Sequence, residues 1–178
     1  MANELTQGEA FELMKALDGD FNSEEFINDG LRYGEEIRLK NEKEAAQYTE
    51  AIKRLPRNAE LYYKRGARYH SLKEQDKALD DFNKAASLDP KKGKYLMSIS
   101  GIYFEQGETE KADAYFQKAL EADPDNAAEH YYTRALQTMF NTQDKEKATE
   151  YYRKSVEHGD YMGLSQQALD LDNPEETK

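Results

Sequence analysis

Histidines and paired carboxylates are the side chains in this sequence that could perform acid–base or metal chemistry. The three histidines are His70, His130 and His158, and no two of them lie within five residues of each other. The two-histidine spacing of a zinc-protease helix is therefore missing, as is any comparable ligand pattern. Acid pairs such as Asp80-Asp81 and Glu35-Glu36 fall in charged, helix-forming stretches, where we expect solvent-exposed carboxylates rather than a general acid and base.

Other enzyme signatures are missing from the sequence too. It contains no GxSxG motif, no Walker loop and no GxGxxG fingerprint. Because it has no cysteine, it has no thiolate zinc site, no cysteine nucleophile and no disulfide framework. We therefore expect a protein that is not an enzyme, has no cofactor and binds no metal.

Charge is spread unevenly over the 178 residues. The net charge is −11, of which residues 1–36 carry −8 and residues 170–178 carry −3, so that residues 37–169 are neutral. A neutral middle between acidic ends argues against nucleic-acid and membrane partners. No signal peptide or membrane helix is evident, and a cytoplasmic protein is the expectation, although a trimmed export signal would leave the same pattern.

Composition and periodicity predict an all-α repeat protein. The chain has one valine and five isoleucines, too few β-branched residues for a sheet, and is rich in helix formers. Pro56, Pro90 and Pro124 are spaced 34 residues apart. The same step relates Tyr69 to Tyr103, Ala78 to Ala112, Phe82 to Phe116 and Ala85 to Ala119. A fixed period of this length is typical of stacked helical repeats.

Residues 59–92 and 93–126 resemble the tetratricopeptide repeat (TPR) family. The family pattern is matched by Gly66–x2–Tyr69, Ala78–x3–Phe82 and Pro90, and again by Ser100–x2–Tyr103, Ala112–x3–Phe116 and Pro124. The resemblance implies a right-handed α-solenoid of antiparallel helix pairs. Arg65 replaces the usual leucine, and we expect its stem to be buried and its guanidinium to remain in water.

The rest of the chain extends this single repeat domain at both ends. Residues 1–22 are expected to hold an acidic helix, with Thr6–x–x–Glu9 as its cap, and residues 23–58 a degenerate repeat with helices at about 23–40 and 42–54. Residues 127–159 resemble a Sel1-like repeat. Residues 160–171 are expected to form a capping helix that begins at Asp160, followed by a tail over 172–178.

The resemblance also implies where a partner binds. In such arrays the first helices of successive pairs line a concave surface that holds extended peptides. The residues expected on that surface are Tyr63, Lys64, Ala67, His70, Lys94, Met97, Gly101, Phe104, Tyr132 and Leu136. Aromatic, small and methionine side chains would give it depth and adaptability. The alternative for some of them is packing against the second helices or the terminal helices.

A chaperone-binding subgroup of the family grips a C-terminal Glu-Glu-Val-Asp peptide with lysine, asparagine and arginine side chains. The equivalent positions here hold Tyr63, Ala67, Ser98, Glu129 and Thr133, none of which matches that clamp. We therefore expect the partner to be a protein or extended peptide other than this carboxylate ligand.

Two functions remain open from the sequence. The first is a binding module that recognises a partner in its concave face. The second is a structural role, in which the chain forms a homo-oligomer, such as a homodimer, through apolar terminal helices. The residues concerned are Phe11, Leu13 and Leu17 at one end and Tyr161, Met162 and Leu164 at the other. RNA binding is disfavoured because no basic stripe is present.

The acidic segment 1–36 raises one further hypothesis. It could occupy part of the groove by interacting with Lys64, Arg68 and Lys94 when no partner is bound. Such surface attraction is weak and screened by salt, so a solvated acidic cap is the favoured alternative.

Overall fold

The computed structural model describes residues 23–172, with side chains described over residues 31–169. Within this range every regular element is a helix, as the composition predicts. The helix expected after Thr6 and most of the expected tail lie outside the described residues. The chain divides at Lys40 and Asn41 into two compact units, and the repeat array belongs to the second.

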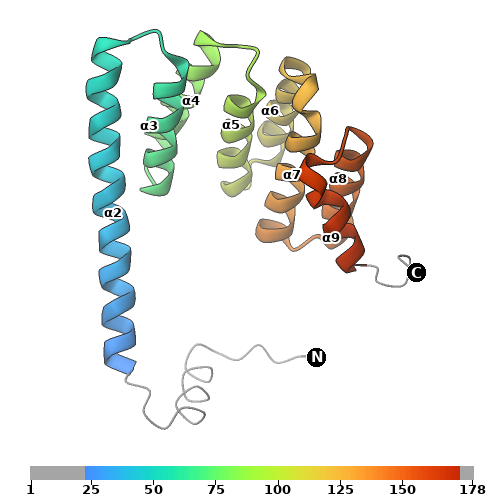
Figure 1. Cartoon of the computed structure of the whole chain (residues 1–178), viewed down its shortest axis with the longest axis horizontal. Helices are drawn as coiled ribbons and strands as arrows, with labels where there is room; N and C mark the ends of the chain where they lie inside the picture. Colours follow the sequence, from blue (N-terminus) through green and yellow to red (C-terminus); the bar gives the residue numbers. More distant parts are fainter. Residues whose placement is uncertain (1–22, 173–178) are drawn as a thin grey trace. The chain divides into compact units, whose positions relative to one another are not determined.

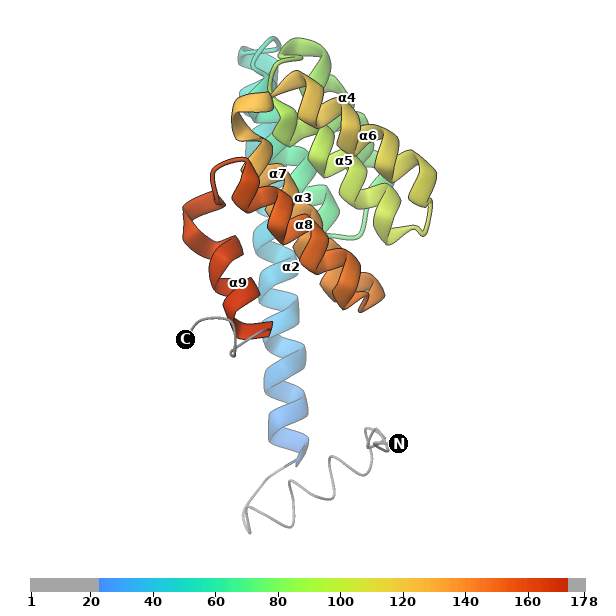
Figure 2. The same cartoon turned by 90° about the vertical axis from the view of Figure 1, so that its right-hand side faces the viewer.

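The second unit is a right-handed α-solenoid of stacked helix pairs (Figure 1). The described helices of the chain are α2 (Ser23–Arg54), which belongs to both units, and, in the second unit, α3 (Ala59–Ser71), α4 (Gln75–Leu88), α5 (Gly93–Glu105), α6 (Thr109–Ala122), α7 (Ala127–Thr142), α8 (Lys145–Glu157) and α9 (Leu164–Asp172). The pairs α3/α4, α5/α6 and α7/α8 are antiparallel, and each packs on the next (Figures 1 and 2). Short 3-10 turns at Pro124–Asn126 and Tyr161–Gly163 lead into α7 and α9.

The prediction of two helices within residues 23–54 is wrong, because α2 runs through the expected break as one helix of 32 residues. The capping residues proposed for the break bind a neighbouring helix instead. Asn41 and Glu44 both accept hydrogen bonds from Arg68 Nη1 in α3, at 3.2 Å each. With no proline or exposed cap to stop it, the backbone stays helical.

Small residues allow the two helices of a pair to come close, as the repeat pattern predicts. A Cβ atom on Gly66 would lie 2.8 Å from the Phe82 ring, which is closer than such contacts allow. In the next pair, Ser100 Oγ donates a hydrogen bond of 2.6 Å to the Ala112 carbonyl, and both residues are fully buried. These positions fix the distance between first and second helices.

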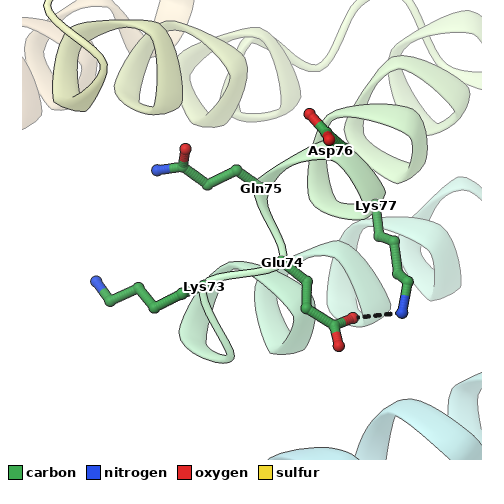
Figure 3. A pocket seen from close by; sticks show the side chains of 5 residues that line it. All are labelled: Lys73, Glu74, Gln75, Asp76 and Lys77. Atoms are coloured by element: carbon green, nitrogen blue, oxygen red, sulfur yellow. Dashed lines mark ion pairs between the residues drawn. The ribbon is translucent and has the colours of Figure 1, made fainter.

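The turn between first and second helix carries an ion pair stacked on a tyrosine. Lys77 Nζ lies 2.7 Å from Glu74 Oε2 and 5.3 Å from the centre of the Tyr69 ring. Residues Lys73–Lys77 line a hollow of about 410 Å³ at this turn, and Figure 3 shows the ion pair at its edge. The arrangement recurs 34 residues later with Glu108, Lys111 and Tyr103. The turn is thus encoded by the repeat, and the cation–aromatic contact supports it.

Arg65 does not behave as predicted, since its guanidinium is paired rather than solvated. Its Nε and Nη2 donate to the two carboxylate oxygens of Asp81 at 2.7 Å each, and Nη1 donates to Thr49 Oγ1 at 3.1 Å. Asp81 is 4% exposed, which makes this a buried bidentate pair. The hydrogen bonds to Asp81 raise the pKa of Arg65.

The C-terminal part of the array ends much as expected. Asp160 Oδ1 accepts hydrogen bonds from the backbone N–H groups of Ser165 and Gln166, at 3.0 and 3.3 Å. It therefore caps α9, although the helix begins at Leu164 rather than directly after Asp160. None of the described helices has both the length and the apolar character that a membrane crossing requires.

Candidate functional site

The histidines occupy three unrelated environments. His70 Nε2 lies 2.9 Å from Glu105 Oε2, and the His158 ring stacks on Tyr131 at 5.2 Å. His130 is buried, and burial lowers its pKa. Among the described residues no three histidine or acidic side chains are grouped so that they could hold a metal ion.

The residues expected to bind a partner lie on α3, α5 and α7, the first helices of the three pairs. Lys64 is exposed, and six others are partly exposed: Tyr63, Ala67, His70, Lys94, Tyr132 and Leu136. Gly101 is also partly exposed, but a Cβ atom there would come within 2.8 Å of Gln137 Nε2. The end of the Gln137 side chain therefore lies over Gly101.

Two expected groove residues belong to the core instead. Met97 is 5% exposed and packs with Phe116 and Ala119. Phe104 is 8% exposed, and the Arg134 guanidinium lies 4.3 Å from its ring centre. Arg134 is fully buried and pairs with Asp113 of α6. Neighbouring helices therefore cover Met97, and the expectation that it lines an open surface is wrong. Phe104 is also largely covered, but part of it lines a hollow described below.

At the start of the row, an aromatic and ionic cluster joins α3 to α5. The Tyr63 ring lies 5.3 Å from Tyr95 and 5.7 Å from Phe82. Lys94 Nζ lies 4.7 Å from the Tyr63 ring centre and 2.8 Å from Glu60 Oε2. Burial, and to a smaller extent the nearby negative charge of Glu60, raises the pKa of Tyr95 to about 12. Tyr63 and Lys94 are thus held in place before any partner arrives.

Further along, Tyr132 and Leu136 of α7 pack towards α8 and the C-terminal end of the array. The Tyr132 ring lies 5.9 Å from Tyr152 and 5.5 Å from Tyr161, and both Tyr132 and Leu136 pack around buried Ala135 and Ala148. Tyr132 is half-buried, so that part of its ring contributes to the core and part remains accessible.

Two of the three cations proposed to attract the acidic N-terminal segment are already paired within the array. Arg68 binds Glu44 and Asn41, and Lys94 binds Glu60. Lys64 is left exposed without a hydrogen bond or ion pair among the described residues. Residues 1–22 lie outside the described part, so the hypothesis stays a prediction with a weaker basis.

A feature that the sequence did not indicate is a hollow of about 730 Å³ where the first helices end, here called the rim hollow. It is lined by Lys73, Gln75, Phe104, Glu105, Gly107, Thr109, Phe140, Asn141 and Thr142. These residues come from the turns after α3 and α5 and from the end of α7. Phe140, 78% exposed, is its most open apolar side chain. The only sequence signal is that Phe140 holds the position of Glu105 in the preceding repeat, so an apolar residue stands where a charged one is exposed.

A polar network supports the rim hollow. Glu105 Oε2 accepts from Gln75 Nε2 at 3.4 Å as well as contacting His70, and Gln106 Nε2 donates to Gln75 Oε1 at 2.9 Å. These bonds connect the turns of two successive pairs. An apolar side chain could lie against Phe140 and the edge of Phe104, with Glu105 and Lys73 beside it to orient polar groups.

Family comparisons agree with the geometry of the central pairs. Models of the tetratricopeptide repeat match residues 59–92 and 93–126. Over 83 residues the chain is 41% identical to small glutamine-rich tetratricopeptide repeat-containing protein 2 of Saccharomyces cerevisiae, covering 47% of this chain and 24% of that protein. Over 79 residues it is 37% identical to Hsp70-Hsp90 organizing protein 1 of Glycine max, covering 44% of this chain and 14% of that protein.

The matched part thus spans a quarter or less of these relatives. Among solved structures, a crystal structure of MamA protein aligns with a TM-score of 0.51 over 64% of this chain and 61% of that chain, at 20% sequence identity. At that identity the likeness concerns the fold alone. Together with the helix pairs, the family matches identify residues 59–126 as two tetratricopeptide repeats.

Proposed function

We propose that this protein is a non-enzymatic interaction module that binds a segment of a partner protein along the face formed by α3, α5 and α7. Tetratricopeptide repeats mediate protein–protein interaction, and the two matched repeats supply the central part of this face. The observation that carries the proposal is the rim hollow, where an open aromatic side chain and fixed polar groups meet at the end of that face.

The proposed contacts differ from one end of the face to the other. Lys64 and the exposed sides of Tyr63 and Lys94 would contact polar groups along one edge of an extended partner segment. The accessible parts of Tyr132 and Leu136 would contact apolar side chains. Phe140 would anchor a single apolar side chain, in keeping with the concentration of binding energy in a few central aromatic contacts.

The proposed ligand is not a C-terminal Glu-Glu-Val-Asp peptide. One relative is named as an Hsp70-Hsp90 organizing protein, which makes this question specific. The equivalent clamp positions are Tyr63, Ala67, Ser98, Glu129 and Thr133, which offer no cation to the carboxylates. Calorimetric titration with such a peptide is expected to give no submicromolar binding; a submicromolar dissociation constant would contradict the assignment.

The experiment for the main proposal is a selection of displayed twelve-residue peptides against the immobilised protein, followed by calorimetry on the peptides recovered. Phe140→Ser is expected to weaken their binding at least about tenfold, because it removes the aromatic anchor. Leu39→Ser is the matched control, since Leu39 is also an exposed apolar residue, at 51%, but lies in α2 and lines neither the rim hollow nor the hollow at Arg54–Asn58 described below. Equal loss in both variants, or no loss in either, would overturn the proposal.

A second candidate, self-association through the C-terminal end, is favoured by the 78% exposure of Met162. An open apolar residue at the end of an array can pair with its own copy. Light scattering over a concentration series separates the two candidates. A dimer that Met162→Ser converts to a monomer would support self-association, while a monomer at all concentrations would exclude it.

A further inference from the structure

The last turn of α2 and the two loops that lead into α3 and α5 are strongly basic, in contrast to the chain as a whole. Residues 53–58 and 89–92 contain five cations and a single carboxylate, Asp89, although the protein carries a net charge of −11. The cations are Lys53, Arg54, Arg57, Lys91 and Lys92, here called the basic edge. It does not continue into the next repeat, where Asp125 occupies the position of Arg57 and Lys91.

The two loops are neighbours in space. Glu60, in the first turn of α3, accepts from Lys94 Nζ at 2.8 Å and from the Tyr95 hydroxyl at 3.3 Å, and both donors lie in the first turn of α5. The residues that immediately precede these two helix starts therefore lie side by side. The positive ends of two helix dipoles point to the same edge and add to its attraction for anions.

Most of these cations are free to bind. Within residues 31–169, Arg54, Arg57, Lys91 and Lys92 form no side-chain hydrogen bond or ion pair, and all four are exposed. By contrast Lys53 is paired with Glu50 at 2.6 Å, and Lys94 is held by Glu60. The unpaired charges thus lie at the C-terminal end of α2 and on the two loops.

The first loop also presents a shaped apolar site. Residues Arg54–Asn58 line a hollow of about 510 Å³, in which Leu55 is 58% exposed and Pro56 lies between the two arginines. The loop is fixed by its own bonds: the Tyr62 hydroxyl donates to the Pro56 carbonyl at 3.1 Å, and Asn58 Oδ1 accepts from the Glu60 N–H at 3.1 Å. A ligand would therefore meet a preformed surface.

From these observations we propose that the basic edge is a second docking surface, which binds an acidic segment of a partner protein with an apolar side chain seated beside Leu55. The four unpaired cations supply the charge complementarity, and the hollow lined by Arg54–Asn58 receives the apolar side chain. A peptide fits better than a nucleic acid, because only two loops are basic and the net negative charge repels a long polyanion. This surface is distinct from the rim hollow, which lies at the other ends of α3 and α5.

The test measures binding of a fluorescent twelve-residue peptide of aspartate and glutamate around one central leucine, by anisotropy at low and physiological salt. The double variant Arg57→Glu/Lys91→Glu is expected to weaken binding at least about tenfold. Lys84→Glu/Arg153→Glu makes the same change in net charge at exposed cations of α4 and α8, and should cost less than about threefold. Equal loss in the two double variants would show non-specific attraction and overturn the proposal.

Three further arms identify the ligand. Leu55→Ser should weaken the leucine-containing peptide but not an all-acidic one, whereas no effect on either would remove the apolar site from the proposal. A single-stranded RNA of equal length that binds as tightly as the peptide would reassign the edge to nucleic acid. Self-association at low salt that the Arg57→Glu/Lys91→Glu variant abolishes would instead assign the basic edge to an acidic end of a second copy.

The two proposed surfaces are tested independently. Phe140→Ser, in the rim hollow, should leave peptide binding at the basic edge unchanged, so that a negative result at one surface does not decide the other.

Discussion

Breaking the buried ion pair between α3 and α4 should cost more than removing both of its members. Asp81→Ala leaves the Arg65 guanidinium, 18% exposed as a side chain, with only the Thr49 hydroxyl as acceptor. Removing one partner of a buried pair costs about 3–5 kcal/mol, and the residual exposure of Arg65 places this case near about 3 kcal/mol. For a chain of this length that loss corresponds to about 6–12 °C in melting temperature.

The double variant Arg65→Met/Asp81→Ala provides the decisive comparison. It removes the unpaired charge and fills the space of the arginine stem, while Thr49 keeps its hydrogen bond to the Ala45 carbonyl at 2.9 Å. Its free energy of unfolding should fall by less than half of the loss in Asp81→Ala, and Arg65→Met alone should also be less stable than the double variant. Urea denaturation followed by circular dichroism gives all three values. Additive losses would refute the view that the unpaired charge causes the instability.

Three other predictions test packing and protonation. Gly66→Ala should destabilise the array by up to about 2 kcal/mol, because overpacking against Phe82 outweighs a helix-propensity gain of about 1 kcal/mol. Gly34→Ala should instead raise helix stability, because a Cβ atom there meets nothing within 4 Å. Thermal melts that show a stability change of the same sign for both variants would contradict this. Burial lowers the pKa of His130, despite opposing effects of Asp123 and Glu129, so stability should fall as pH drops below about 6.5. Melting from neutral to acidic pH should show a smaller fall for His130→Gln than for the parent protein, and identical curves would remove His130 as the cause. The pKa of Tyr95 is raised to about 12, so the stability that the protonated tyrosine contributes should be lost as pH rises above about 10. Melting temperatures measured at alkaline pH should therefore fall less steeply for Tyr95→Phe than for the parent protein.

The sequence was sufficient for the central helix pairs, because their determinants are local and repeated. Pro56 and Pro90 end helical segments, and Gly66 marks a close approach that the structure shows at the Phe82 ring. The family matches cover the residues that this spacing delimits. The period predicts the structure because equivalent residues make equivalent helix contacts in each repeat.

The α2 helix could not be predicted from local signals. Asn41 and Glu44 have the spacing of a capping box, but an arginine 24 residues beyond Glu44 takes both side chains. Whether these side chains cap a helix or bind a distant residue depends on how the helices pack, and the spacing of Asn41 and Glu44 carries no information about that packing.

The candidate site was predictable in outline only. The positions on α3, α5 and α7 follow from the repeat, but exposure at each depends on the next pair. Phe104 is covered because Arg134 is buried against it, at a position that holds Ile99 in the preceding repeat. Phe140 is open because it holds the exposed position of Glu105 in the preceding repeat, where the residue type and not the register departs from the repeat. Both effects depend on which residue stands at a repeated position, and the spacing alone does not give that.

The Glu60–Lys94 contact gives the two repeats a fixed order. The two residues occupy the same position in successive repeats, so the first contributes the anion and the second the cation. Duplicating residues 59–92 in tandem would set one glutamate against another, and duplicating residues 93–126 would set one lysine against another. The two repeats are therefore not interchangeable. An array lengthened by further copies of them must alternate negative and positive side chains at this position.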